Sequence, residues 1–202
     1  MNEFKRLWKL TVKILTNEIG GFTIDDGKGS GKSAEVDENN HLVVNSITQT
    51  IEHYINHVDG NAFNLLFAAT PASTGDCFIY MKNTSDDDFS VEGIWLWLAA
   101  DEYVDVKLDD TGTPVGGSAI TPANLSGSGN TPTGTFQQGN NITGLSGGTT
   151  VDRIYHASSQ ESQSYNFDQD IILRKNGVFT MYIQTGTTAL AGKIVFNIHS
   201  QA

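Results

Sequence analysis

Residues 168–199 read DQDIILRKNGVFTMYIQTGTTALAGKIVFNIH, and the pattern of this stretch decides the fold class. Asn176-Gly177 stands between two apolar runs, and this dipeptide is the strongest short-range signal for a hairpin turn. Beyond it, apolar and polar residues alternate over 178–183 and again over 194–199, as they do in strands with one buried face. We therefore expect a three-stranded antiparallel meander, which needs a second sheet over its apolar face.

Upstream, further strand-like runs recur at residues 41–47, 62–69, 76–82, 89–99 and 103–108. Glycine is abundant (21 residues) and only 17% of residues are charged, a profile typical of an all-β domain with many turns. At this length the chain can bury a core without disulfides or a metal. We predict an all-β fold, an antiparallel two-sheet sandwich, over residues 41–202.

Residues 1–40 differ from this body and form a separate predicted segment, a short basic arm followed by a flexible Gly/Ser linker. Residues 1–15 carry four basic side chains and one acidic one, a net charge of +3, which leaves −14 for the rest of a chain whose total is −11. We expect the arm to be helical, with apolar and basic residues on different faces, although the same residues also alternate as in a strand. A docking role on an acidic or apolar partner is assigned to its aromatic and basic side chains: Phe4, Lys5, Trp8, Lys9 and Lys13.

A long uncharged stretch separates Asp110 from Asp152, with 41 residues that include no Lys, Arg, Asp or Glu. It holds 10 of the 21 glycines and three of the four prolines, so it is too rich in turns to be regular sheet throughout. Apolar residues are nevertheless spaced along it and can anchor the loop onto a neighbouring copy of the chain. We assign contacts between copies to six of them: Val115, Ile120, Leu125, Phe136, Ile142 and Leu145.

The composition argues against several classes of function. A net charge of −11 disfavours nucleic-acid binding, which needs clustered Lys and Arg, and no apolar run is long enough to predict a membrane span. Residues 27–33 are glycine-rich like a phosphate-binding loop, but Asp26 stands where such a loop needs its first glycine. We expect the single cysteine, Cys77, to be a small buried hydrophobe.

We predict no catalytic residues, no metal site and no cofactor, and hence no enzyme. His53 and His57 lack the neighbouring residues of a zinc site, and no pair of carboxylates stands out as a hydrolase would require. We expect the acidic clusters, Asp86–Asp88 and Asp105–Asp110, to be solvated turns because neither has the spacing of a calcium loop.

Trp95 and Trp97 lie two residues apart and therefore share one face of a strand. Packing in a core or an interface is the simpler interpretation, since burying such rings contributes several kcal/mol at about 25 cal/mol per Å². A pair of aromatic rings on one face can also form a platform on which sugars stack, so a lectin-like function stays open.

Several phrases of the sequence resemble those of a group of tailed-bacteriophage proteins that decorate or cement the virion head. The phrases span most of residues 35–199: DGNAFNLLFAATP (59–71), GDCFIYMKNTS (75–85), DDTGTPVGGSAITPANL (109–125), GNNITGLSGG (139–148) and DQDIILRKNGVFTMYIQTG (168–186). Such proteins are similar to jelly-roll sandwiches, sit at symmetric positions on a capsid, often as trimers, and have no enzymatic residues to carry over. The resemblance says least about the N-terminal arm.

The resemblance implies that the sandwich is of jelly-roll type, with about eight strands. It also implies a structural protein of the virion, made in the host cytoplasm and bound to the outer surface of the capsid. Its expected partners are the major capsid protein and further copies of itself, in a homotrimer, with no nucleic acid and no membrane. The alternative is a receptor-binding or lectin-like module on a head or tail fibre.

Overall fold

The computed structural model describes residues 23–25, 33–36, 42–43, 56, 59–158, 161–186 and 188–199. The chain divides into two units, Met1–Thr48 and Gln49–Ala202; the boundary between residues 40 and 41 stays a prediction. The predicted docking residues of the arm, Phe4 to Lys13, lie outside the described residues.

Three short strands form an antiparallel sheet in the first unit, in the order β1 (Thr23–Asp25), β2 (Ser33–Val36) and β3 (Leu42–Val43). We expected Ser33–Val36 to belong to a flexible linker, but its residues pair with β1. Leu42–Val43, which we assigned to the body, pairs with β2 instead.

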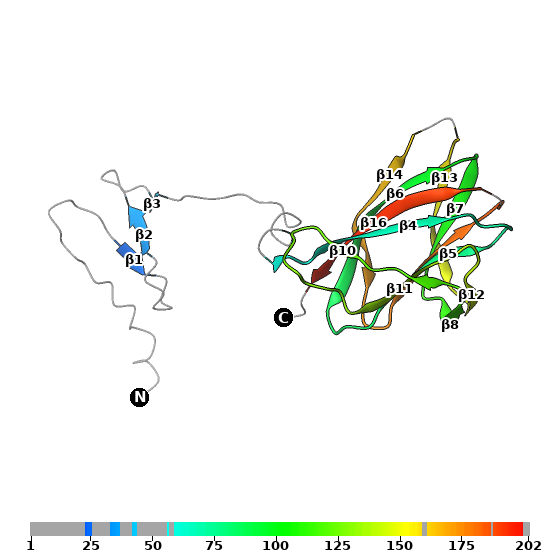
Figure 1. The fold of residues 1–202 in the computed structure, drawn as a ribbon. Helices are drawn as coiled ribbons and strands as arrows, with labels where there is room; N and C mark the ends of the chain where they lie inside the picture. Colours follow the sequence, from blue (N-terminus) through cyan, green and yellow to red (C-terminus); the bar gives the residue numbers. More distant parts are fainter. Residues whose placement is uncertain are drawn as a thin grey trace. The chain divides into compact units, whose positions relative to one another are not determined.

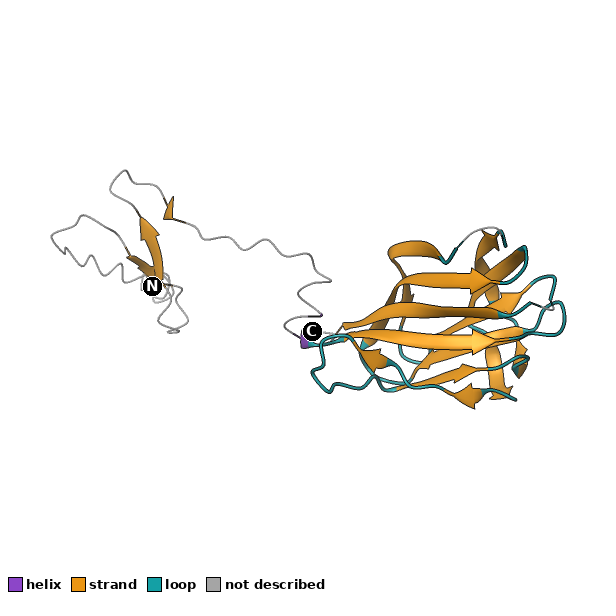
Figure 2. Ribbon diagram, turned by 45° about the horizontal axis from the view of Figure 1, so that its top comes forward, coloured by secondary structure: helices purple, strands orange, loops and turns teal. Residues whose placement is uncertain are grey.

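The second unit is an antiparallel sandwich of two sheets, which form the two layers of strands in Figures 1 and 2. Sheet I has the strand order β10-β4-β16-β6-β14, and sheet II has the order β13-β7-β15-β5-β11-β9. The strands of sheet I are β10 (Ala123–Asn124), β4 (Ala62–Ala69), β16 (Leu190–His199), β6 (Asp88–Leu98) and β14 (Gln163–Leu173). Those of sheet II are β13 (Thr149–His156), β7 (Glu102–Leu108), β15 (Val178–Ile183), β5 (Cys77–Asn83), β11 (Gly134–Gln138) and β9 (Ser118–Ala119). A separate two-stranded sheet joins β8 (Thr111–Val115) to β12 (Thr143–Ser146).

The main strands follow a jelly-roll topology. Taken in chain order as β4, β5, β6, β7, β13, β14, β15 and β16, the first pairs with the last, the second with the seventh, and so on inward. This nested pairing is that of one long antiparallel ribbon wrapped over itself, and pairing of β16 with β6 and of β15 with β7 completes the two sheets. The predicted antiparallel sandwich of jelly-roll type is therefore confirmed.

The predicted meander over 168–199 is wrong, because its three strands do not pair with one another. β14 and β16 belong to sheet I, whereas β15 lies in sheet II. The Asn176-Gly177 turn is present, with Asn176 in the left-handed region (φ 69°) and a hydrogen bond from Gly177 N to Arg174 O of 2.7 Å. It carries the chain from sheet I to sheet II, and each of the two strands that it joins pairs with strands far away in the sequence.

The core lies between the sheets, and a cluster of phenylalanines marks its centre. The ring of Phe196 stacks or tilts against three others, with centroid distances of 5.4 Å to Phe63, 5.3 Å to Phe89 and 5.8 Å to Phe136. All four side chains are buried. At roughly 2–3 kcal/mol for each fully buried large apolar side chain, such a cluster is a main source of stability.

Residues 111–148 of the uncharged stretch pack onto their own chain. Strand β11 extends sheet II beyond β5, and β10 extends sheet I beyond β4, so this segment covers the edges of both sheets on one side. Farther along, Ile142 is buried with Cys77, Tyr80 and Val178 on the outer face of sheet II. The segment is thus an integral part of the body.

Two acids of the predicted solvated clusters are buried, which corrects that expectation. Asp110 accepts hydrogen bonds from Thr180 Oγ1 (2.6 Å), Tyr182 Oη (2.8 Å) and Gly148 N (2.9 Å). Asp105 accepts two from Arg153, at 2.6 and 2.9 Å. Paired in this way, a carboxylate can be buried without losing its hydrogen-bond partners.

Candidate binding surface

The outer face of sheet I carries the exposed side chains of Leu66 and Trp97, whereas Ile142 and Leu145 of the uncharged stretch pack on the outer face of sheet II. Strand pairing places outward side chains of β4, β16, β6 and β14 in rows across sheet I. One row runs from Leu66 through Lys193 and Trp95 to Ser164. The next, towards the ends of β4 and β6, runs from Ala68 through Ala191 to Trp97.

Apolar residues lie towards one end of this face, next to Lys193. Leu66 is 62% exposed and Trp97 is 42% exposed, and Ala68 is also exposed while Ala191 is half-buried. We call these four residues the apolar patch. Large apolar side chains that gather on a surface in this way mark sites of interaction with other molecules.

A β-bulge shapes the other half of the face. On β16, Val195 pairs with Gly93 and Phe196 with Val91, so Glu92 has no residue opposite it in this ladder. On the other side of β6, the β14 register also shifts there, from Asn166 opposite Gly93 to Ile171 opposite Val91. Bulges bend a strand and re-aim its side chains, and they are frequent next to functional sites.

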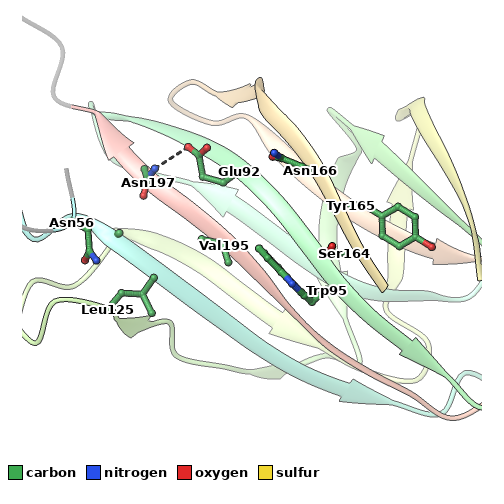
Figure 3. A pocket seen from close by; sticks show the side chains of 10 residues that line it. Asn56, Glu92, Trp95, Leu125, Ser164, Tyr165, Asn166, Val195 and Asn197 are labelled. Atoms are coloured by element: carbon green, nitrogen blue, oxygen red, sulfur yellow. Dashed lines mark hydrogen bonds between the residues drawn. The ribbon is translucent and has the colours of Figure 1, made fainter. Parts of the chain in front are cut away.

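An open groove of about 590 Å³ lies beside this bulge. It is lined by ten residues: Asn56, Ala62, Glu92, Trp95, Leu125, Ser164, Tyr165, Asn166, Val195 and Asn197. Figure 3 shows the Trp95 indole towards one end and the Glu92–Asn197 pair towards the other, with Val195 between them. The groove therefore offers an aromatic ring, aliphatic side chains and amides within one concave surface.

Two polar contacts fix parts of the groove, and one polar atom has no partner. Asn197 is buried, and its Nδ2 donates to Glu92 Oε1 at 2.8 Å. The Lys193 ammonium lies 4.4 Å from the Trp95 ring centroid and holds the indole in place. By contrast, Asn56 Oδ1 is a buried acceptor without a hydrogen bond.

The Tyr165 ring is turned away from the groove. It packs partly against the core, and its hydroxyl donates to Tyr155 O on β13 at 3.0 Å. Desolvation, followed by the nearby charge of Asp152, raises the pKa of Tyr165 above its ordinary value. Trp95 is consequently the ring that the groove presents to a ligand.

The structure brings no group of metal-ligating side chains together among the residues that it describes, where no three His, Cys, Asp or Glu side chains converge. Cys77 is buried as predicted, and burial, together with the nearby charge of Asp110, raises the pKa of its thiol to about 12. A thiol with that pKa stays protonated near neutral pH and is a poor nucleophile. In the part of the chain that the structure describes, no helix is long and apolar enough to cross a membrane.

The predicted loop residues separate into two groups. Phe136 and Ile142 are buried in the body, while Ile120 and Leu145 are half-buried against its two apolar clusters. Val115 (59% exposed) and Leu125 (44% exposed) remain accessible to another molecule. The assignment of contacts between copies therefore now rests on these last two.

Trp95 and Trp97 both point outward from sheet I, so they do not pack in the core. The sequence had singled out this pair, but not the amides and the carboxylate that complete the groove: Asn56, Glu92, Asn166 and Asn197. A signal for the bulge is nevertheless present in β6, because its buried apolar positions change from odd (89 and 91) to even (94, 96 and 98).

Comparison of this chain with protein-family models, with curated proteins and with solved structures finds no match.

Proposed function

We propose that this protein is a structural component of a tailed-phage particle that binds the outer surface of the capsid and holds neighbouring major capsid subunits together. It acts by adhesion, without chemistry of its own, and occupies the outside of the virion after synthesis in the host cytoplasm. The observation that carries the proposal is the apolar patch of Leu66, Ala68, Trp97 and Ala191 on the outer face of sheet I.

Multivalent attachment explains how a small patch can be sufficient. A capsid presents many identical sites in a fixed geometry, so several weak contacts made together give a high overall affinity. In the proposal, the basic arm with Phe4, Lys5, Trp8, Lys9 and Lys13 supplies one contact and the apolar patch supplies another. The charge of −14 after residue 15 keeps the decorated surface from aggregating.

Copies of the chain meet around a local symmetry axis in this proposal, in a homotrimer. The accessible side chains Val115 and Leu125 are the members of the uncharged stretch assigned to these contacts. An exposed aliphatic side chain on a loop that is packed onto its own body presents a contact at low cost in conformational entropy.

Co-sedimentation with phage heads assembled without this protein tests the proposal. The full chain is expected to sediment with the heads at a fixed ratio to the major capsid protein. The double variant Leu66→Ser/Trp97→Ser, and separately a chain that lacks residues 1–20, should each weaken attachment by about tenfold or more.

The matched control is Val151→Ser, which removes an exposed apolar side chain from β13 of sheet II and should bind like the parent. Circular dichroism establishes that each variant is folded. Full occupancy of the heads by both the patch variant and the truncated chain would overturn the proposal.

A further inference from the structure

The groove beside the β6 bulge has the chemistry of a small-ligand site and is separate from the apolar patch. Its volume of about 590 Å³ lies within the roughly 300–1,000 Å³ typical of such sites. Trp95 and Val195 provide aromatic and aliphatic surface, whereas Asn197, Asn166 and Ser164 provide polar groups. A fitting ligand therefore needs apolar patches and hydrogen-bonding groups close together.

The charge of the lining argues for a neutral ligand. Among the described residues that line the groove, Glu92 alone carries a charge, and its Oε1 accepts from Asn197. Lys193 does not line the groove, and its ammonium lies over the Trp95 ring. An anionic ligand would be repelled by the Glu92 carboxylate without a lining Lys, Arg or His to compensate. A cationic ligand would meet a single carboxylate, that of Glu92, which already accepts a hydrogen bond from Asn197.

The hydrogen-bonding groups of the groove favour a ligand that can donate. Asn56 Oδ1 is buried and has no partner, and a buried acceptor left in this state is unfavourable. A ligand hydroxyl would supply the donor. Except at the bulge residue Glu92, the residues that line the groove on β16 and β6 have backbone groups paired with neighbouring strands, so an extended peptide would find few free main-chain partners there.

We propose that this groove binds a neutral saccharide. The apolar C–H face of a sugar ring packs on the Trp95 indole, which Lys193 holds in position. Its hydroxyls donate to Asn56 Oδ1 and exchange hydrogen bonds with the Asn197–Glu92 pair. The inference does not depend on capsid attachment, because it uses side chains outside the apolar patch.

Titration of the full chain with neutral hexoses, N-acetylhexosamines and their short linear oligomers tests this inference. Calorimetry and tryptophan fluorescence are expected to report saturable binding of at least one of them, with a dissociation constant of about 1 mM or tighter. Trp95→Ala should weaken that binding by about tenfold or more. Trp97→Ala is the matched control, since Trp97 is the next outward residue of the same strand and does not line the groove; it should change the constant by less than about twofold.

A second variant guards against misfolding of Trp95→Ala. Ser164 lies opposite Trp95 on β14 and is exposed, so Ser164→Tyr should fill the groove without disturbing the core. Loss of binding in this variant, with an unchanged circular dichroism spectrum, would support the assignment. Absence of binding to all of these sugars, binding of acidic sugars only, binding of a peptide in their place, or equal affinity in Trp95→Ala and the parent would each overturn it. Because Leu66→Ser/Trp97→Ser leaves the groove lining intact, failure of capsid attachment and failure of sugar binding can be told apart.

Discussion

The Asp110 carboxylate connects the uncharged insertion to sheet II. One oxygen accepts from the backbone of Gly148, and the other accepts from Thr180 and Tyr182 on β15. Replacement of this buried side chain would leave these donors without their acceptor. Each unsatisfied buried donor carries a free-energy penalty. The residue therefore matters for stability more than its position in an acidic turn suggests.

We expect Asp110→Ala to lower the free energy of unfolding by about 3 kcal/mol, because bonds to a charged acceptor contribute about 1.5–3 kcal/mol each and are not additive. Urea unfolding measures the change. Asp86→Ala is the control: its bond to Lys175 Nζ is similarly short at 2.6 Å, but Asp86 is 90% exposed in the side chain. It should lose less than about 1 kcal/mol, and equal losses in the two variants would contradict the interpretation.

Cys77 should make stability depend on pH above its ordinary pKa. The folded thiol has a pKa of about 12, raised by burial from 9.0, so the unfolded chain loses its proton first as the pH rises. The contribution is complete below about pH 9 and declines by about 1.4 kcal/mol per pH unit towards about pH 12. The free energy of unfolding, measured at about pH 8 and about pH 10, should fall more in the parent than in Cys77→Ala; parallel curves would show that Cys77 contributes nothing.

Among single residues, the sequence correctly predicted that Cys77 is buried, but it did not settle whether Trp95 is buried. A cysteine inside an apolar run has few alternatives to burial. Whether Trp95 points inward or outward depends on which alternate residues of β6 face the core. The bulge at Glu92 switches these residues from odd to even positions between Val91 and Ile94. Simple alternation therefore cannot tell which face of this strand is buried.

Strand β14 lies close against Gly93, the residue beside the bulge of β6. An added Cβ there would lie 2.6 Å from the Tyr165 carbonyl oxygen on β14. That contact involves backbone, which cannot turn aside as a flexible side chain can. The groove and the attachment of the edge strand β14 thus both depend on this glycine.

Gly93→Ala should lower the free energy of unfolding by about 1–3 kcal/mol, the usual cost of overpacking. Gly117→Ala is the control, since its added Cβ meets the Gln137 side chain, which can move, and its loss should be smaller. Thermal unfolding followed by circular dichroism compares the two. A Gly93→Ala protein as stable as the parent would show that β14 can shift without penalty.

Strand β11 contributes Phe136 to the core, where its ring lies 5.8 Å from Phe196 and 6.2 Å from Phe89. Phe136→Ala should therefore cost about 3–5 kcal/mol in the free energy of unfolding of a single chain. Val115→Ala, at an exposed position of the same insertion, should cost less than about 0.5 kcal/mol. Chemical denaturation at several protein concentrations makes the comparison; a Phe136→Ala effect that vanishes on dilution would place this ring between copies instead.

The elements themselves were largely predictable, but their pairing was not. The run at residues 62–69 matches β4, and the predicted strand at 103–108 lies within β7. The Asn176-Gly177 turn was also found, yet the strands on either side enter opposite sheets. Local alternation reports that a strand has a buried face, and it is silent on which distant strand lies beside it.

The whole body is built from contacts between residues far apart in the chain. Its first main strand, β4, pairs with its last, β16, so the sandwich closes only when both are in place. The resemblance to phage proteins implied a jelly roll, which local patterns alone could not distinguish from other two-sheet sandwiches. Pairing of strands that are distant in the sequence costs the entropy of closing a long loop. It also requires that the other strands of the sandwich be in place.

We expect refolding from urea to take milliseconds to seconds or longer, as is typical of β-sandwiches dominated by non-local pairing. Stopped-flow tryptophan fluorescence measures the rate. Complete refolding within microseconds would contradict the nested order of strands. The time scale should be the same at all protein concentrations if one chain forms the sandwich alone.

The pairing of β4 with β16 also sets how the body responds to force. Ala62, at the start of β4, lies opposite Asn197, near the end of β16. Tension applied between these two points would peel the strands apart one hydrogen bond after another. A pull parallel to the strands, applied at opposite ends of the pair, would instead have to break many hydrogen bonds at once. A body of this design resists shear parallel to its strands far better than traction at that corner.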